Sequence, residues 1–274
     1  MSNIWLSWFN WLDASTSGIE ADAEAGDLVV ENLRERQGFK VWRTDGLSLG
    51  ATDAGFDVDF RQVRAVQALA LVFPRSNDPA EYDEPASFAS TDTIRHRLSA
   101  VSAGAGELYD SGVVASGVLD GYGYHVIKLS APVNARYWRV DLDAISRADL
   151  GYVDVARAWA GPVFAPAIGF SFGESYGWQS DSSISKASRG VGEFVDNVDS
   201  LRSWSMTCEG LSDNERETLI DFERRMTAAG QFLVARSDIS AGKGEMLARQ
   251  QQSLGMTSLA HARNQKAFRL VESL

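Results

Sequence analysis

The sequence predicts a mainly β protein, with an N-terminal jelly-roll β-sandwich followed by a smaller antiparallel β domain with one helix. Three observations support this fold class. Short apolar runs with strand periodicity fill residues 1–166, and turns rich in Gly, Asp, Asn and Ser separate them. No long amphipathic pattern interrupts these runs, and one clear helical pattern lies far downstream. All six prolines lie at or before Pro166.

The distribution of prolines also predicts a domain boundary. The segment Ala160–Pro166 reads AGPVFAP. It favours an extended connector, because each proline moves the preceding residue away from the α region. We therefore expect a β-sandwich domain at residues 1–166 and an α+β domain at residues 167–274.

Two strands of the first domain carry the strongest patterns. Val66–Phe73 is apolar on both faces, which is typical of a central strand covered on both sides. Arg136–Asp143 alternates, and it would bury Trp138, Val140 and Leu142 on one face. Shorter strands are expected at Lys40–Thr44, Phe56–Phe60, Ile94–Val101, Leu108–Val114, His125–Leu129 and Tyr152–Trp159.

The second domain combines strands with the predicted helix. Ser212 and Glu215 have the spacing of a capping box, so the helix should begin there and run to about Ala229, before Gly230. Its apolar stripe would consist of Leu219, Phe222 and Met226, widened by Ile220. Strands are expected at Leu201–Cys208, Gln231–Arg236 and Ala267–Val271.

Composition excludes several classes of protein. The net charge of −11 disfavours nucleic-acid binding, which needs a basic surface. A single cysteine, Cys208, rules out an intrachain disulfide framework or a cysteine zinc site, and we expect it to be a buried, inert thiol. The apolar runs are too short to span a bilayer, so no membrane association is expected.

The search for catalytic chemistry gives no candidate. The histidines His96, His125 and His261 form no metal-binding spacing. His96, between two arginines, is expected on a solvated strand face, and His125 is expected to be structural or exposed. Nucleophile-elbow and phosphate-loop motifs are missing. We therefore predict no enzyme activity and no catalytic, cofactor-binding or metal-binding residue.

The acidic stretch Asp78–Glu84 leaves two interpretations open. Its four carboxylates could hold a hard cation such as calcium through oxygen ligands. It lacks the glycine and the regular ligand spacing of a calcium loop, which favours a solvated loop.

Four large aromatic residues near the N-terminus also need an explanation. Trp5, Trp8, Phe9 and Trp11 fall within seven residues and are poorly suited to water. They could pack in the core of the first domain or form an interface with a neighbouring subunit. Neither a strand nor a helix places all four on one face, so some aromatic surface should remain for a partner.

Several motifs of the first domain resemble the galactose-binding-like, or discoidin-type, jelly roll. They are Glu31–Leu33, Lys40–Thr44, Phe56–Phe60, Val66–Phe73, the ARYWRV run Ala135–Val140 and the closing stretch Tyr152–Gly161. The resemblance implies a galactose-binding-like β-sandwich at residues 1–166. Because this family includes carbohydrate-binding modules, aromatic residues in loops become candidate sugar contacts: Tyr82, Phe88, Tyr122 and Tyr124.

The two domains in this order are similar to tail proteins of long-tailed bacteriophages and prophages. The motifs of the second domain are Phe170–Gly173, Gly177–Trp178 and Ser188–Gly190, and residues 167–274 resemble a distal-tail-type domain. The resemblance implies a non-enzymatic structural protein of the tail tip or baseplate, located in the virion tail and assembled in the bacterial host cytoplasm.

Such a protein would form a homo-oligomeric ring that connects the tail tube to hub and receptor-binding proteins. The expected partners are the tail tube protein, hub or baseplate proteins and the tape-measure protein. The alternative is a carbohydrate-binding module that contributes to adsorption on the host surface, with a surface carbohydrate as its partner. No cofactor is expected in either case.

Overall fold

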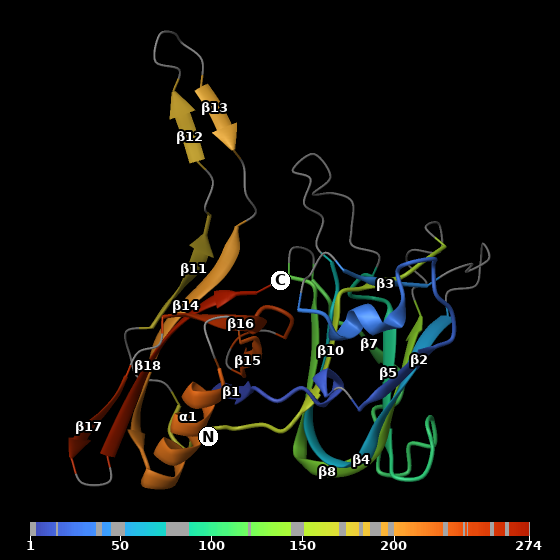
Figure 1. The fold of residues 1–274 in the computed structure, drawn as a ribbon, viewed down its shortest axis with the longest axis horizontal. Helices are drawn as coiled ribbons and strands as arrows, with labels where there is room; N and C mark the ends of the chain where they lie inside the picture. The colour runs from blue at the N-terminus through green and yellow to red at the C-terminus, as the bar shows by residue number, and fades with distance from the viewer. Residues whose placement is uncertain are drawn as a thin grey trace. The chain divides into compact units, whose positions relative to one another are not determined.

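A computed structural model describes most of the chain. The described residues are 4–14, 16–36, 40–44, 53–74, 88–119, 122–143, 151–169, 174–180, 183–186, 193–196, 200–226, 230–237, 239, 241–252, 255–260 and 263–273. The fold is mainly β and antiparallel, as predicted (Figure 1). Within these residues, no helix is long and apolar enough to cross a membrane.

The chain divides into two compact units. The larger, here called the large unit, contains Trp5–Phe164 and Phe232–Met246. The small unit contains Ala165–Gln231 and Leu247–Ser273. The chain therefore leaves the large unit close to the predicted boundary and later contributes one further segment to it. The domain limits 1–166 and 167–274 stay a prediction.

The large unit is built around one antiparallel sheet with the strand order β10–β4–β8–β5–β6, in which β2 also pairs with β4 and β7 with β5. A separate ladder joins β3 to β9, and β1 neighbours β15. The strands are β1 Ile4–Ser7, β2 Gly18–Ala21, β3 Trp42–Arg43, β4 Asp53–Val72, β5 Thr93–Ser99, β6 Tyr109–Asp110, β7 Val114–Ala115, β8 Tyr124–Asp143, β9 Asp154–Val155, β10 Arg157–Gly161 and β15 Phe232–Arg236. Two short 3₁₀ helices, η1 Trp11–Asp13 and η2 Val30–Arg34, complete the unit.

Strands β4 and β8 are each 20 residues long and pair along most of their length. Each strand joins two segments that the sequence predicts as separate strands. The register shifts between Asp59 and Arg64, where Arg61 has a positive φ of 62° and its amide donates to the Asp59 carboxylate. A β-bulge of this kind bends a strand and increases its twist, so the long pair can curl around the core (Figure 1).

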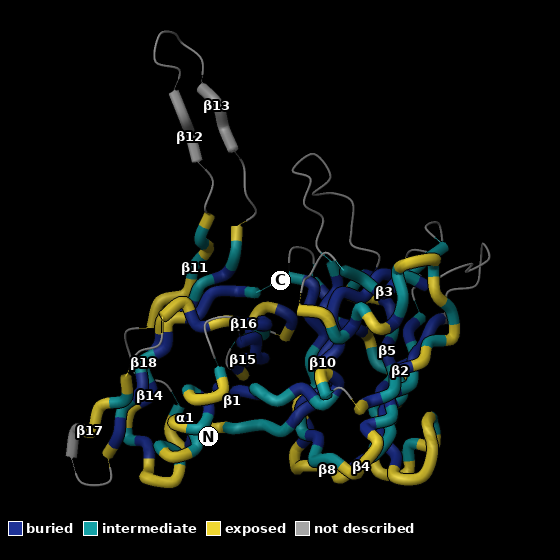
Figure 2. The backbone as a smooth tube through the Cα atoms, viewed as in Figure 1, coloured by how far each residue is buried: buried dark blue, intermediate teal, exposed yellow. Residues whose placement is uncertain are grey.

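Aromatic rings fill the interior of the large unit. The ring of Phe56 lies edge-on between Trp42 and Trp138, with centroids 5.5 and 5.6 Å away. Trp138, Val140 and Leu142 are buried, which confirms the predicted face of this strand. Strands β10 and β15 are buried along their whole length and are dark blue in Figure 2.

The structure corrects the prediction for His96. This side chain is fully buried, because it shares the strand face of Ile94 and Leu98 rather than that of the flanking arginines. His125 is also buried, at 6% exposure, which matches the structural alternative. His261 lies outside the described residues.

The small unit contains an antiparallel sheet with the order β16–β18–β14–β11, and β17 pairs with β18. Its strands are β11 Ser175–Gln179, β14 Leu201–Leu211, β16 Glu245–Gln252, which enters this unit at Leu247, β17 Met256–Ala260 and β18 Arg263–Glu272. A separate hairpin pairs β12 Ser183–Lys186 with β13 Glu193–Asp196.

Helix α1 spans Asp213–Arg225 and begins with the predicted capping box. The Ser212 hydroxyl accepts the Glu215 amide, and the Glu215 carboxylate accepts the Ser212 amide. The helix ends before Ala229, because Met226 already has an extended backbone. Leu219 and Phe222 are buried as predicted, whereas Ile220 is 45% exposed and does not widen the stripe.

The sheet of the small unit contains a buried ion pair that the sequence did not indicate. Arg202 on β14 and Glu272 on β18 are both fully buried, and the guanidinium donates to Oε1 of the carboxylate at 2.6 and 3.0 Å. Cys208 on β14 is buried, as predicted, and burial raises the pKa of its thiol to about 12.

The two faces of β8 provide a test of the register. Replacing Trp138 by Ala should lower the free energy of unfolding by about 3–5 kcal/mol, because it empties a fully buried site. Tyr137→Ala should cost clearly less, since this ring lies half-buried on the other face beside the Arg136 guanidinium. Urea unfolding measures both values, and equal losses would contradict the register.

Candidate functional site

A cleft of about 380 Å³ lies on the face of the main sheet that points away from the core. It is placed where β4 and β5 begin and β8 ends. Charged side chains make up much of its lining: Asp22, Arg95, Arg97, Arg139, Asp141 and Asp143. Uncharged residues supply the rest: Ala54, Thr93, Ile94, Val113 and Leu142.

Strand alternation explains why these charges share one face. In β5, the buried residues Ile94, His96 and Leu98 alternate with Arg95 and Arg97. In β8, the buried Val140 and Leu142 alternate in the same way with Arg139, Asp141 and Asp143. Successive side chains point to opposite faces of a sheet, so packing the apolar set inside directs the charged set outside.

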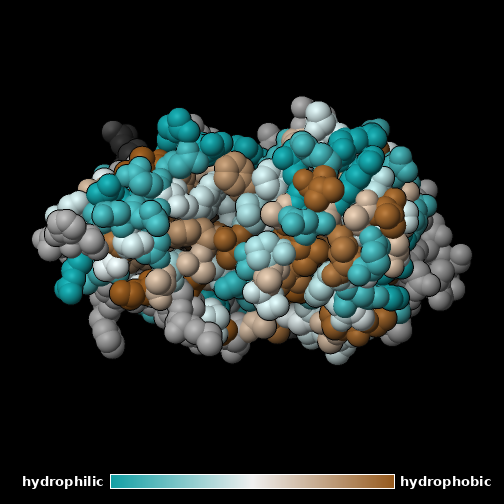
Figure 3. Space-filling model, turned by 90° about the horizontal axis from the view of Figure 1, so that it is seen from below, coloured by the Kyte–Doolittle hydropathy of each residue, from teal (hydrophilic) through white to brown (hydrophobic). Residues whose placement is uncertain are grey.

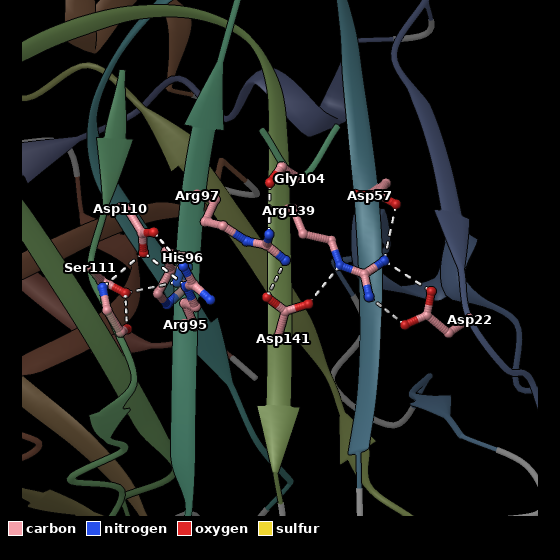
Figure 4. Close-up of polar contacts among 11 residues, drawn as sticks. Asp22, Asp57, Arg95, His96, Arg97, Gly104, Asp110, Ser111, Arg139 and Asp141 are labelled. Carbon is pink, nitrogen blue, oxygen red and sulfur yellow. Dashed lines mark hydrogen bonds and ion pairs between the residues drawn. The ribbon is translucent and has the colours of Figure 1, made fainter. Parts of the chain in front are cut away.

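The pairing of β5 with β8 places two positive charges opposite one another. Arg97 faces Arg139 in this register, an arrangement that destabilises a sheet unless it is compensated. Asp141 compensates it by accepting from both guanidinium groups, at 2.6 Å from Arg97 and 2.8 Å from Arg139 (Figure 4). The carboxylate therefore ties the two strands together through their side chains.

Arg139 is the centre of the network. Its guanidinium also donates to Asp57 on β4 at 3.0 Å and to Asp22 at 2.9 Å (Figure 4). Burial lowers the pKa of Arg139, but hydrogen bonds with Asp22 and Asp141 outweigh it, and the net shift is upward. Burial raises the pKa of Asp57, and the charge of Arg139 limits that rise. Arg139 thus remains charged and holds three carboxylates in place.

Gly55 provides the space for this guanidinium. A Cβ atom at position 55 would lie 2.5 Å from Nη2 of Arg139 and 2.7 Å from the carbonyl oxygen of Val140. The second contact is with backbone, which cannot move aside as a side chain can. The network therefore requires glycine at this position of β4.

The two arginines of β5 are also anchored. Arg95 forms a bidentate ion pair with Asp110 of β6, and this hydrogen bond lowers the pKa of Asp110 to about 2. Arg97 donates to the carbonyl of Gly104 at 2.6 Å as well as to Asp141. Both guanidinium groups are thus held in fixed positions at the cleft (Figure 4).

The chemistry of the cleft is that of a hydrogen-bonding surface. Three arginines and three aspartates line it, so it presents both donors and acceptors and the charges balance. Arginine neighbours compensate Asp22 and Asp141, which makes them poor ligands for a cation. Among the described residues, no group of three His, Cys, Asp or Glu side chains is arranged to hold a metal ion.

None of the predicted sugar-contact residues that the structure describes, Phe88, Tyr122 and Tyr124, lines this cleft. Phe88 and Tyr124 are fully buried, and Phe88 stacks on Phe73 in the core with centroids 4.7 Å apart. The expectation is therefore wrong for these two, because a buried ring has no face to offer a sugar. Tyr122 is half-buried, with the Lys243 ammonium 5.9 Å from its ring. Tyr82 and the stretch Asp78–Glu84 lie outside the described residues.

The N-terminal aromatic residues of the predicted interface separate into two groups. Trp5 is buried at 5% exposure, so it contributes to packing and not to an exposed surface. Trp8, Phe9 and Trp11 are half-buried. The Trp11 indole donates to the carbonyl of Ala65, and the Trp8 ring lies 5.7 Å from that of Phe164. These three rings are anchored in the large unit and keep part of their surface exposed.

Sequence reasoning missed the residues of the cleft. The alternation in the two strands could have indicated them. In Arg95–Arg97 of β5 and Arg139–Asp143 of β8, every second residue is charged, and the pairing of the strands puts these residues on the same face. The contacts themselves depend on the strand register, which the sequence pattern leaves open.

The role of Gly55 can be tested by one substitution. Gly55→Val should displace the Arg139 guanidinium or shift β8, because the new side chain cannot avoid the Val140 carbonyl. We expect a loss of stability of about 1–3 kcal/mol in urea unfolding, the typical cost of overpacking. Gly177→Val, at a position with open space on β11, is the matched control and should cost less. Equal effects would contradict the role of Gly55.

No protein-family model and no curated protein matched the chain. Solved structures gave matches, among them the family 32 carbohydrate-binding module of NanJ from C. perfringens in complex with galactose. It has 11% identity and a TM-score of 0.41, covering 58% of this chain and 99% of that one. The lectin domain of lectinolysin complexed with Lewis B antigen has 13% identity and a TM-score of 0.39. The match covers 59% of this chain and 99% of the lectin domain. A fucose-binding module of Streptococcus pneumoniae has 13% identity and a TM-score of 0.36. The match covers 56% of this chain and 94% of the module. Similarity at this level assigns no ligand to the present chain.

Proposed function

We propose that the protein binds a carbohydrate in the cleft of the large unit and catalyses no reaction. The observation that carries this proposal is the charge-balanced set of fixed donors and acceptors on β5 and β8. Each sugar hydroxyl both donates and accepts hydrogen bonds, so it suits a surface that presents both guanidinium and carboxylate groups. Side chains already held in place lose little freedom when a ligand binds.

The balance of charge favours a neutral ligand. A phosphate or nucleic-acid site needs a positive excess, whereas here each arginine has an aspartate partner. Among the apolar lining residues, Val113 is 68% exposed and can cover the C–H surface of a sugar ring. A neutral glycan therefore fits the described lining better than an anion does.

The same network argues against catalysis. Both oxygens of Asp141 accept from guanidinium groups, so structural contacts hold this carboxylate in place. A general acid or base needs direct access to the substrate proton. A carboxylate fixed between two guanidinium groups is better suited to orienting hydroxyl groups.

Glycan binding can be measured by a panel screen followed by isothermal titration calorimetry. Arg95→Ala should weaken the best-binding neutral glycan by about 10-fold or more, as expected for one lost charge-assisted hydrogen bond. The matched control is Arg224→Ala, an exposed arginine paired with Asp221 on the helix of the small unit. It should bind like the wild-type protein.

Two outcomes would contradict the proposal. One is that no neutral glycan gives saturable binding. The other is that Arg95→Ala binds as tightly as the wild-type protein while its urea unfolding is unchanged.

A second candidate function is a structural role in the tail tip or baseplate of a bacteriophage, as a ring between the tail tube and hub proteins. Exposed aromatic residues on β11 favour it, since Tyr176 is 39% and Trp178 is 48% exposed. Strand β11 is at the edge of its sheet among the described strands. Exposed edges with aromatic side chains suit contacts with other protein chains.

This candidate predicts assembly. Light scattering and negative-stain electron microscopy of the purified protein would then show closed rings, and Trp178→Ser would reduce their formation. A protein that stays monomeric at high concentration and binds a glycan would favour the first function alone.

The surface view does not by itself favour either function. In Figure 3, hydrophobic residues lie in small patches between hydrophilic ones. Single large apolar residues are commonly exposed on soluble proteins.

A further inference from the structure

Two histidine side chains lie together inside the large unit. His96 on β5 is fully buried and His125 on β8 is 6% exposed. Their rings are parallel within 2°, and the centroids are 5.2 Å apart. Histidine is the side chain whose ordinary pKa lies closest to neutral pH, so a buried pair is a place where mild acid can act on a core.

Hydrogen-bond partners assign the tautomer of each ring. The Trp138 indole can only donate, and it lies 3.2 Å from Nδ1 of His96. This nitrogen must therefore accept, and the proton of neutral His96 is on Nε2. The Ser116 carbonyl can only accept, and it lies 2.6 Å from Nδ1 of His125. Neutral His125 therefore carries its proton on Nδ1.

A second proton has no favourable position on either ring. On His96 it would occupy Nδ1 and point at the indole N–H of Trp138, so the hydrogen bond between them would be lost. On His125 it would occupy Nε2, a buried nitrogen without a hydrogen-bond partner. Nε2 of His96 is also buried and unpartnered. Burial lowers the pKa of both rings, and that of His96 is lowered further by the nearby His125.

Among the described residues, no carboxylate contacts either imidazole ring. From β8, the groups facing His96 are His125 and Trp138. Next to β6, the Ser111 hydroxyl accepts a hydrogen bond from the backbone amide of His96. Next to β7, the backbone carbonyl of Ser116 accepts a hydrogen bond from Nδ1 of His125. Asp92, whose carbonyl accepts the Ser116 amide, directs its carboxylate to the amide of Ala89.

The charged neighbours within β5 face the other way. Arg95 and Arg97 flank His96 in the sequence, but they point to the outer face and pair with Asp110 and Asp141 (Figure 4). Their positive charges would disfavour a protonated His96 rather than compensate it.

We propose that the His96–His125 pair is an acid-sensitive lock that holds β5 in the core of the large unit at neutral pH and releases it in mild acid. Above about pH 7 both rings are neutral in the folded and unfolded states, so the pair makes no pH-dependent contribution to stability there. As the pH falls below about 6.5, the unfolded chain takes up protons that the folded unit excludes, so stability falls. The loss grows until the pH reaches the lower pKa values of the folded state.

The lock also has a consequence for the cleft, which rests on the proposed function. His96 lies between the two arginines that β5 presents there, so a loosened β5 would displace both guanidinium groups. Glycan binding should therefore weaken in mild acid.

The experiment compares pH dependence in the full chain. The double variant His96→Asn/His125→Asn keeps an acceptor for Trp138 and a donor for Ser116 but cannot titrate. In the wild-type protein, the unfolding constant from urea titrations between pH 7.5 and 5.0 should rise by up to about 100-fold per pH unit, the limit for two protons. In the double variant this histidine-dependent rise should disappear. His261→Asn, which changes the third histidine, should behave like the wild-type protein.

Identical pH dependence in the wild-type and double-variant proteins would overturn the proposal. If the double variant does not fold, His125→Asn alone should reduce the limit to about 10-fold per pH unit. NMR of the imidazole groups in the wild-type protein gives a second test: two rings should remain neutral at pH 6, and titration of all three near pH 6.5 would also overturn it. These measurements need no ligand, so failure of every glycan to bind would count against the proposed function only.

Discussion

The antiparallel pairing of β4 with β8 is the constraint on which the rest of the large unit depends. Each strand has two faces with opposite requirements, because Phe56, Val58 and Trp138 must be buried while Asp57 and Arg139 carry charge. A shift by one residue would exchange the faces and place these charges in the core. Burial of the aromatic rings therefore fixes the register, and the register determines which charged groups meet outside.

The outer network depends on that register. Arg139 is opposite Asp57 on one side and Arg97 on the other, so the sheet brings together one favourable and one unfavourable pair. Asp141 and Asp22 each form an ion pair with Arg139, so the charged side chains make one connected network. Gly55 leaves room for the Arg139 guanidinium at the centre of this network. Individual surface ion pairs contribute little stability, whereas a rigid array of donors and acceptors has a clear use in binding.

Local patterns in the sequence predicted much of the fold but little of the site. The alternation in Arg136–Asp143 and the capping box at Ser212 depend on nearby residues, and both are confirmed. Contacts such as Arg97 with Asp141 depend on pairing between distant strands. His96 was wrongly predicted to face solvent because two arginines flank it in the sequence. It alternates with those arginines and shares the strand face of Ile94 and Leu98, so it is buried in the core. Phe88 and Tyr124 were assigned to exposed loops, and their packing in the core could not be read from the local pattern.

We propose that the outer face of β5 and β8 binds a neutral glycan. A crystal structure of the protein with its best-binding glycan tests it most directly. We expect sugar hydroxyl groups within hydrogen-bonding distance of Arg95 and Arg97 or of Asp143, with Arg139 still bound to Asp22 and Asp141. A glycan bound elsewhere on the protein, with this cleft unoccupied, would show that the cleft is not the glycan site.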